Sequence, residues 1–303
     1  MTQSRRRKKR RRSKKIKRRT YMYLWHTTVG VMTLFILFAL WTQFEVSKAS
    51  KRNTVQRNES GAAEVEMDVV TKDAVNEDLT GLSPAEKEIA GYANERGYYL
   101  RDYTEDLIAL YEKNEEARQF VLDYPLKKDM DFDIDLSEYS STDTVPLFMQ
   151  WDDRWGYSEY AGNVLGISGC GPTCLSMVAV YLTKDTSKNP KWMAEFATEN
   201  GYYENGNGSK WTLMSQGAQQ LGLNVRELSL DEERMAENLR AGNPIICILG
   251  PGDFTDSGHF IVLTGYRDGG FVVNDPNSRA NSGKIWTLEE LRGQIRALWV
   301  YWK

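Results

Sequence analysis

Residues 168–177 read SGCGPTCLSM, a run in which two glycines flank a cysteine and a proline follows. Apolar residues then recur at the spacing typical of one buried helix face: Leu175, Val178, Ala179 and Leu182. Pro172 suits the first turn of a helix, where a backbone N–H has no partner. Cys170 is therefore expected at or just before a helix N-terminus. The helix dipole and unpaired N–H groups favour a thiolate there, which makes Cys170 a candidate nucleophile; the alternative is a buried structural cysteine.

The chain has three cysteines, too few for a disulfide framework. Cys170 and Cys174 are one helical turn apart, which places their Cβ atoms about 5–6 Å apart, whereas a disulfide needs roughly 3.8 Å. Cys247 lies in the apolar run 244–249, which predicts a buried strand. We expect three free thiols, with Cys247 in the core.

Only two histidines occur, and His26 lies in an apolar N-terminal segment. His259 is thus the one candidate for a catalytic base in the rest of the chain. It opens a β-rich run, residues 268–270 form a predicted turn, and the returning run ends near Asp275. A hairpin brings its two ends together, so the Asp275 carboxylate is expected to reach and orient the imidazole. The alternative is an ordinary strand histidine followed by a turn.

These residues together resemble the C39-like cysteine peptidases, a papain-like family. The resemblance covers residues 144–303 and rests on four pieces in the expected order: Gln150, Cys170 to Met177, Gly258-His259-Phe260 and Asn274-Asp275-Pro276.

The resemblance implies a role for each matched residue. Cys170 would be the nucleophile, and His259 would be the general base and acid. Asp275 would orient His259, and Gln150 would stabilise the oxyanion together with the backbone N–H of Cys170. Cys174 matches a position that is not the nucleophile.

The order of predicted elements indicates an α+β fold, because helices come first and strands gather late. The resemblance implies the papain-like arrangement of N-terminal helices and a C-terminal antiparallel sheet. The predicted helices cover about 172–183, 190–199, 212–221, 231–240 and 287–295. The predicted strands cover 224–229, 244–249, 259–267, 271–275 and 296–302, after an extended segment at 145–150.

The N-terminal part predicts a membrane anchor. Residues 1–20 form a basic tail, and residues 21–44 contain no charged residue. As a helix, this segment would span about 36 Å, enough to cross a bilayer once. The positive-inside rule then places the N-terminus in the cytoplasm and the catalytic domain outside the cell membrane. A cleaved signal peptide is the alternative.

Residues 45–82 are polar and predict a flexible linker. A capping box at Ser83 to Glu86 then predicts the start of a small helical region over 83–125, which we expect Pro125 to end. Residues 144–303 would form the peptidase domain.

Charge and composition limit the partners. Residues 5–19 hold 13 of the 39 basic residues, whereas all 42 acidic residues lie elsewhere, so an acidic body would repel nucleic acid. We expect no cofactor and no metal, because His259 is the single histidine outside the N-terminal segment and, without a Cys-x-x-Cys pair, it does not make a zinc site. The expected partners are membrane lipids at the anchor and a peptide or protein substrate outside the membrane.

The predicted function is peptide-bond hydrolysis through a Cys-His-Asp triad and a thioester acyl-enzyme. Three alternatives use the same features: a peptidoglycan amidase or endopeptidase, a transglutaminase with an amine in place of water, and a non-catalytic ectodomain that binds peptide or cell-wall polymer.

Overall fold

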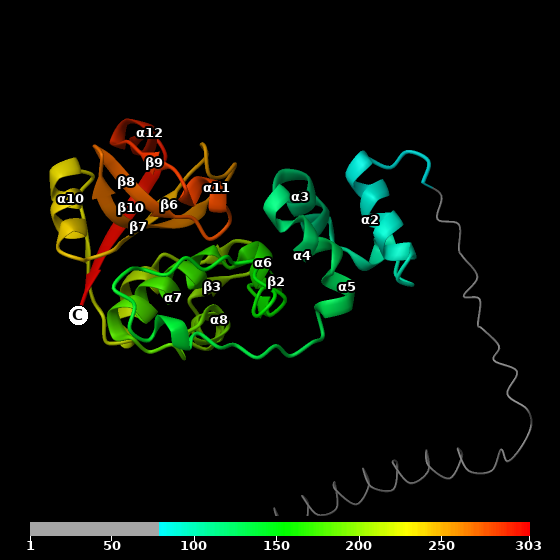
Figure 1. Cartoon of the computed structure of the whole chain (residues 1–303), viewed down its shortest axis with the longest axis horizontal. Coiled ribbons are helices and arrows are strands. Elements are labelled where there is room, and N and C mark those ends of the chain that lie inside the picture. Colours follow the sequence, from blue (N-terminus) through cyan, green and yellow to red (C-terminus); the bar gives the residue numbers. More distant parts are fainter. Residues whose placement is uncertain (1–78) are drawn as a thin grey trace, which may run out of the picture. The chain divides into compact units, whose positions relative to one another are not determined.

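The computed structural model describes residues 79–303 (Figure 1). The predicted basic tail 1–20 and membrane span 21–44 lie outside these residues, as does the predicted linker except for its last four positions. Within residues 79–303, no helix has the length and apolar character needed to cross a membrane.

The helical region follows the predicted signals at its start. Ser83 caps the first helix, and its side chain and that of Glu86 exchange hydrogen bonds with the backbone, which confirms the capping box. The segments are α2 (Pro84–Asn94), η1 (Leu100–Asp102), α3 (Glu105–Lys113), η2 (Glu115–Ala117), α4 (Arg118–Leu122) and α5 (Tyr124–Lys127).

Pro125 does not end this region, so that prediction is wrong. It lies at the second residue of α5, and the helix continues to Lys127. The first turn of a helix tolerates proline because its N–H groups have no partner inside the helix.

The helical region shares a hydrophobic core with the residues that follow it. Ile89, Leu107 and Phe120 are buried in one cluster with Trp151 and Tyr157. The Phe120 and Tyr157 rings stack with their centroids 4.4 Å apart. The helices are therefore packed against the residues around Trp151 and Tyr157 rather than held apart from them.

A six-stranded antiparallel sheet forms the C-terminal half, in the order β5-β10-β6-β7-β8-β9. The late strands confirm the expected mixture of helix and sheet. Their bounds are β5 (Asn224–Glu227), β6 (Ile245–Leu249), β7 (His259–Arg267), β8 (Gly270–Asn274), β9 (Ile285–Trp286) and β10 (Ile295–Trp302).

Both faces of this sheet are buried, because successive side chains of a strand point to opposite sides. On β6, Ile246 and Ile248 pack toward α7 (Cys170–Thr183) and α8 (Pro190–Glu199). Cys247 points the other way and packs with residues of α10 (Glu232–Arg240) and α12 (Leu288–Arg292), which Figure 1 shows beyond the sheet from α7.

The helix predicted over about 212–221 is confirmed as two consecutive helical segments, η4 (Leu213–Gly217) and α9 (Ala218–Gln220). Other short elements had no clear signal in the sequence. They are the pairs β1 (Glu159–Tyr160) with β2 (Asn163–Val164) and β3 (Tyr203–Glu204) with β4 (Gly208–Ser209), and the helical segments α6 (Leu165–Ser168) and α11 (Arg279–Ser282). Residues 145–150 are extended without forming a regular strand.

Candidate active site

Cys170 is the first residue of α7, as its flanking sequence predicted. Both neighbouring glycines are required by close approaches. A Cβ atom on Gly169 would lie 2.3 Å from the Leu165 carbonyl oxygen, and one on Gly171 would lie 2.2 Å from Ser209 Oγ. These contacts hold the corner between α6 and α7 and place β4 against the start of α7, while Cys170 stays partly exposed.

The hairpin of β7 and β8 brings His259 and Asp275 together. His259 opens β7, and Asp275 follows directly after β8. The His259 Nε2 to Asp275 Oδ1 distance is 2.7 Å, and both side chains are buried. The carboxylate is therefore placed to fix the orientation of the imidazole.

Asp275 is in turn held by the chain that follows it. Asn281 Nδ2 donates to Oδ2 at 2.8 Å, and the backbone N–H of Asn277 donates to Oδ1 at 2.8 Å. Ser282 Oγ accepts from the Asp275 backbone N–H at 2.9 Å. Sequence reasoning missed Asn281 and Ser282, because the four-residue helix that carries them is too short for a periodic pattern.

The side chains of Cys170 and His259 interact, and each shifts the pKa of the other. Burial alone would raise the pKa of Cys170. The hydrogen bond and charge of His259 outweigh burial, backbone hydrogen bonds at Phe260 and Gly171 add to them, and the Cys170 pKa falls below its ordinary value.

The opposite shift occurs at His259. Burial alone would lower its pKa, but the charge and hydrogen bond of Asp275, with the contribution of Cys170, raise it to about 10. Burial likewise would raise the pKa of Asp275, yet His259, Asn281 and Asn277 keep it below its ordinary value. These shifts favour the thiolate form of Cys170, the imidazolium form of His259 and the carboxylate form of Asp275.

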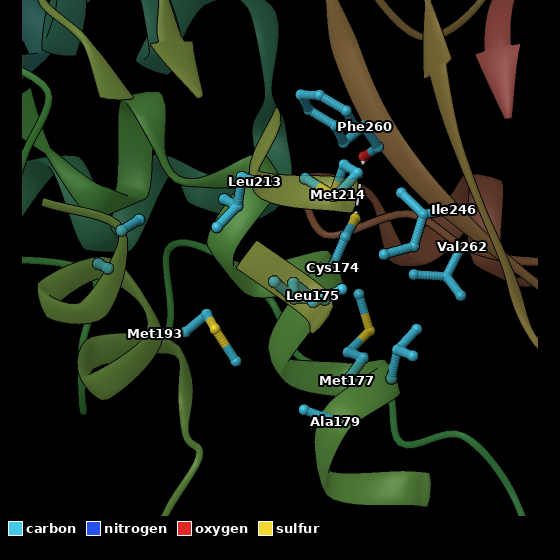
Figure 2. Packing of buried hydrophobic residues seen from close by; sticks show 14 of the residues in the cluster. Cys174, Leu175, Met177, Ala179, Met193, Leu213, Met214, Ile246, Phe260 and Val262 are labelled. Carbon is cyan, nitrogen blue, oxygen red and sulfur yellow. Dashed lines mark hydrogen bonds between the residues drawn. The ribbon is translucent and has the colours of Figure 1, made fainter. Parts of the chain in front are cut away.

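Cys174 lies one turn further along α7 and has different surroundings. Its Sγ donates to the Phe260 carbonyl oxygen at 3.2 Å, and Figure 2 shows it among Met177, Ile246 and Val262. Burial raises the pKa of Cys174, and the same cause raises that of Cys247. All three cysteines are free, and Cys247 is buried on β6 as predicted.

Gln150 lies close to the α6–α7 corner but does not face the thiol with a free donor. Its Nε2 donates to the carbonyls of Gly166 at 2.9 Å and Ile167 at 3.2 Å. Its Oε1 is buried and, among the described residues, has no hydrogen-bond partner. Within residues 79–303, no hydrogen bond joins Gln150 to Cys170 or His259. To bind an oxyanion, the Gln150 amide must either share one N–H between a carbonyl and the oxyanion or rotate away from the Gly166 and Ile167 carbonyls.

Alkylation of Cys170 by iodoacetamide is expected to be faster below pH 9.0 than that of an ordinary thiol, and to slow as the pH falls through the lowered pKa of Cys170. The reason is that the thiolate is the reacting form, and the thiolate–imidazolium pair persists up to the His259 pKa of about 10. Mass spectrometry of the labelled peptides measures the rate. Cys174 and Cys247 are internal controls that should stay unlabelled, because burial raises the pKa of both thiols.

Thermal stability reports this pair less directly than alkylation, because the pKa shifts of Cys170 and His259 change the free energy of unfolding with pH in opposite directions. The ordinary pKa values are 9.0 for Cys170 and 6.5 for His259. The lowered Cys170 pKa adds stability that is present above pH 9.0 and is lost as the pH falls through the folded value. The raised His259 pKa adds stability that is present below pH 6.5 and is lost as the pH rises through about 10. The two contributions to the free energy of unfolding therefore change with pH in opposite directions, and alkylation is the more informative measurement. Alkylation that accelerates only near pH 9 would contradict the ion pair.

Among residues 79–303, no group of three or more His, Cys, Asp and Glu side chains is arranged to hold a metal ion.

Solved structures that are similar to this chain include the following two. One is the peptidase domain of Streptococcus ComA, a bifunctional ABC transporter involved in quorum sensing, with 21% identity, a TM-score of 0.34, and coverage of 44% of this chain and 89% of that one. The other is a putative C39-like peptidase from Bacillus anthracis, with 19% identity, a TM-score of 0.33, and coverage of 53% and 96%. No curated protein matches the chain.

A family model provides the broader assignment. The model of the Peptidase_C39 like family matches residues 142–303, which include Gln150, Cys170, His259 and Asp275. Since this match extends over more than half of the 303 residues, the chain belongs to the Peptidase_C39 like family.

Proposed function

We propose that this chain is a cysteine peptidase that hydrolyses peptide bonds through Cys170, His259 and Asp275. The observation that carries the proposal is the connected series of side chains, from the thiol at the start of α7 to the imidazole and then to the buried carboxylate. Membership of the peptidase family agrees with this chemistry.

The proposed reaction begins when the Cys170 thiolate attacks the carbonyl carbon of the peptide bond and forms a tetrahedral oxyanion. The protonated His259 then gives its proton to the amine nitrogen as the C–N bond breaks, which leaves a thioester on Cys170. Water attacks the thioester while His259 takes a proton from it, and the thiolate leaves as the carboxylate product forms. Asp275 holds His259 and stabilises the imidazolium throughout.

Oxyanion stabilisation is assigned to the backbone N–H of Cys170 and to Gln150. Cys170 is the first residue of α7, and an N–H group at that position has no acceptor within its own helix, so the Cys170 N–H is suited to bind an oxyanion. Gln150 is close to the same corner, where its amide bonds the Gly166 and Ile167 carbonyls. A shared N–H would serve both a carbonyl and the developing oxyanion.

Gln150→Ala is expected to lower kcat by about 100- to 1000-fold with a smaller effect on KM, because an oxyanion donor acts mainly in the transition state. Steady-state kinetics on a cleaved peptide measures the change. The alkylation rate of Cys170 is the control, since it forms no oxyanion. An unchanged kcat would show that Gln150 serves only to hold the α6–α7 corner.

We further propose that the enzyme acts outside the membrane, anchored by residues 21–44. The support is the uncharged segment, with the basic tail before it. Limited proteolysis of intact cells or spheroplasts tests the orientation: the domain should be digested from outside, while residues 1–20 remain protected.

The substrate class is tested with the full chain and with Cys170→Ala on two substrate sets, a panel of peptides and purified peptidoglycan. New amino termini in the peptide set, absent with the variant, support the peptidase. Release of material only from peptidoglycan would instead favour a cell-wall hydrolase, and transfer of an added amine would favour a transglutaminase. Absence of turnover on any set would favour a binding ectodomain.

A further inference from the structure

We propose that the helical region positions the carboxylate of Asp275. It does so through Glu116, which lies on η2, and through Asn114, which is the N-terminal cap of η2. These two side chains hold the segment 275–282, which holds Asp275. The proposal rests on the proposed function of the Cys170 site and gives the helical region a part in it, although that region contains no residue of the triad.

Glu116 binds the start of α11 across 162 to 164 positions of the sequence. Its Oε1 accepts from Ser278 Oγ and from the Ala280 N–H, both at 3.1 Å. Its Oε2 accepts from the Arg279 N–H at 3.0 Å, and the Arg279 guanidinium lies 3.7 Å away. One carboxylate therefore fixes three consecutive residues of the segment.

Asn114 holds the same segment at Asn277, the residue just before those that Glu116 contacts. Its Nδ2 donates to the Asn277 carbonyl oxygen at 2.7 Å and to Asn277 Oδ1 at 3.1 Å. Its Oδ1 accepts from the Glu116 backbone N–H at 3.0 Å, so the two residues form one unit. Trp151 Nε1 also donates to the Asn277 carbonyl, at 3.2 Å.

The held segment supplies the hydrogen bonds that position Asp275. The Asn277 N–H bonds Oδ1, and Asn281, on the short helix that Glu116 caps, bonds Oδ2. Both carboxylate oxygens thus depend on residues 277–281. From Glu116, the path runs through α11 to Asp275, then to His259 and finally to Cys170.

Small displacements in such a path have large effects on rate, because a misplacement of about 1 Å can cost about 100-fold even when the change lies far from the chemistry. A second contact of the helical region, Lys113 with Asp256 at 2.8 Å, reaches the loop before His259. Both of its side chains are largely exposed, and exposed pairs contribute little, so it does not carry the proposal.

The test uses the full chain with Glu116→Ala, Asn114→Ala and the matched control Glu115→Ala. Glu115 belongs to the same 3-10 turn, but its carboxylate pairs with Arg118 instead of the 275–282 segment. We expect Glu116→Ala to lower kcat by about 10- to 100-fold with little change in KM. We also expect the midpoint of the alkylation pH profile of Cys170 to move upward. Glu115→Ala should match the wild type in both.

Glu116→Gln guards against a variant that fails to fold, because it retains an oxygen acceptor and should give an intermediate shift. Thermal melting monitors folding in parallel. A folded Glu116 variant with a lower melting temperature but the wild-type alkylation profile would overturn the proposal and leave Glu116 with a structural role only.

The alkylation profile needs no substrate, which separates this proposal from the proposed function. Failure of the wild type to cleave any peptide would contradict the peptidase, whereas the shift of the profile would still establish that η2 positions the triad. An equal shift in Glu115→Ala and Glu116→Ala would overturn the positioning role, because only one of these residues contacts the segment.

Discussion

Cys170→Ala should lower kcat for peptide hydrolysis by about 10⁴- to 10⁶-fold, the scale seen when a nucleophile is removed from a triad. The variant has no sulfur to form the thioester, so only binding and oxyanion stabilisation remain. Its KM should change little, because Cys170 contributes to the reaction rather than to substrate affinity. Single-turnover assays with high enzyme concentration measure the residual rate.

Cys174→Ala is the matched control for this prediction. It removes a thiol from the same helix, one turn away, where the sulfur bonds the Phe260 carbonyl and burial raises its pKa. We expect it to keep most of the activity and to lose some thermal stability, since it leaves a small cavity in the core. Equal losses of hydrolysis in Cys170→Ala and Cys174→Ala would contradict the assignment of the nucleophile.

His259→Gln should have the second-largest effect, a fall in kcat of about 10⁴-fold or more. Glutamine has a similar length but cannot take up a proton. The variant therefore loses both the partner that stabilises the thiolate and the acid that protonates the leaving amine. Steady-state kinetics of His259→Gln measures the fall in kcat, and the rate of the Cys170→Ala variant is subtracted as the blank.

Alkylation separates the two roles of His259. Without the imidazolium, the Cys170 pKa should return to near its ordinary value of 9.0, because only the backbone hydrogen bonds at Phe260 and Gly171 then oppose burial. At pH 7, about one thiol in a hundred or fewer would be ionised, and labelling by iodoacetamide should slow accordingly. Labelling at the wild-type rate would show that the helix end alone produces the thiolate and that His259 serves only in proton transfer.

Much of the site could be predicted from local sequence. The glycines, proline and apolar spacing around Cys170 predicted a helix start, and α7 begins at that residue. The β-rich runs joined by a turn predicted a hairpin with His259 and Asp275 at one end, and their side chains are 2.7 Å apart. Both features depend on short-range patterns, which periodicity and turn chemistry describe well.

Other parts of the site depend on contacts between distant residues. Gln150 could be located from the resemblance, but the orientation of its amide toward Gly166 and Ile167 depends on how the α6–α7 corner folds. Asn281 holds Asp275 from a helix of four residues, which has no periodic signal. Pro125 was predicted to end the helical region, but it lies in the first turn of α5. A proline is found both in the first turn of a helix and just after a helix ends, so the residue alone does not distinguish the two positions.

The sequence by itself determined where the three candidate side chains lie in the local structure, since their patterns specify a helix start at Cys170 and the two ends of one hairpin at His259 and Asp275. Only the tertiary structure decided that the helical region contacts the segment next to Asp275. Glu116 and the 275–282 segment are more than 160 positions apart, and no local pattern links them. Their contact exists because the helices share a core with residues 149–164, and that packing carries η2 to the loop behind Asp275.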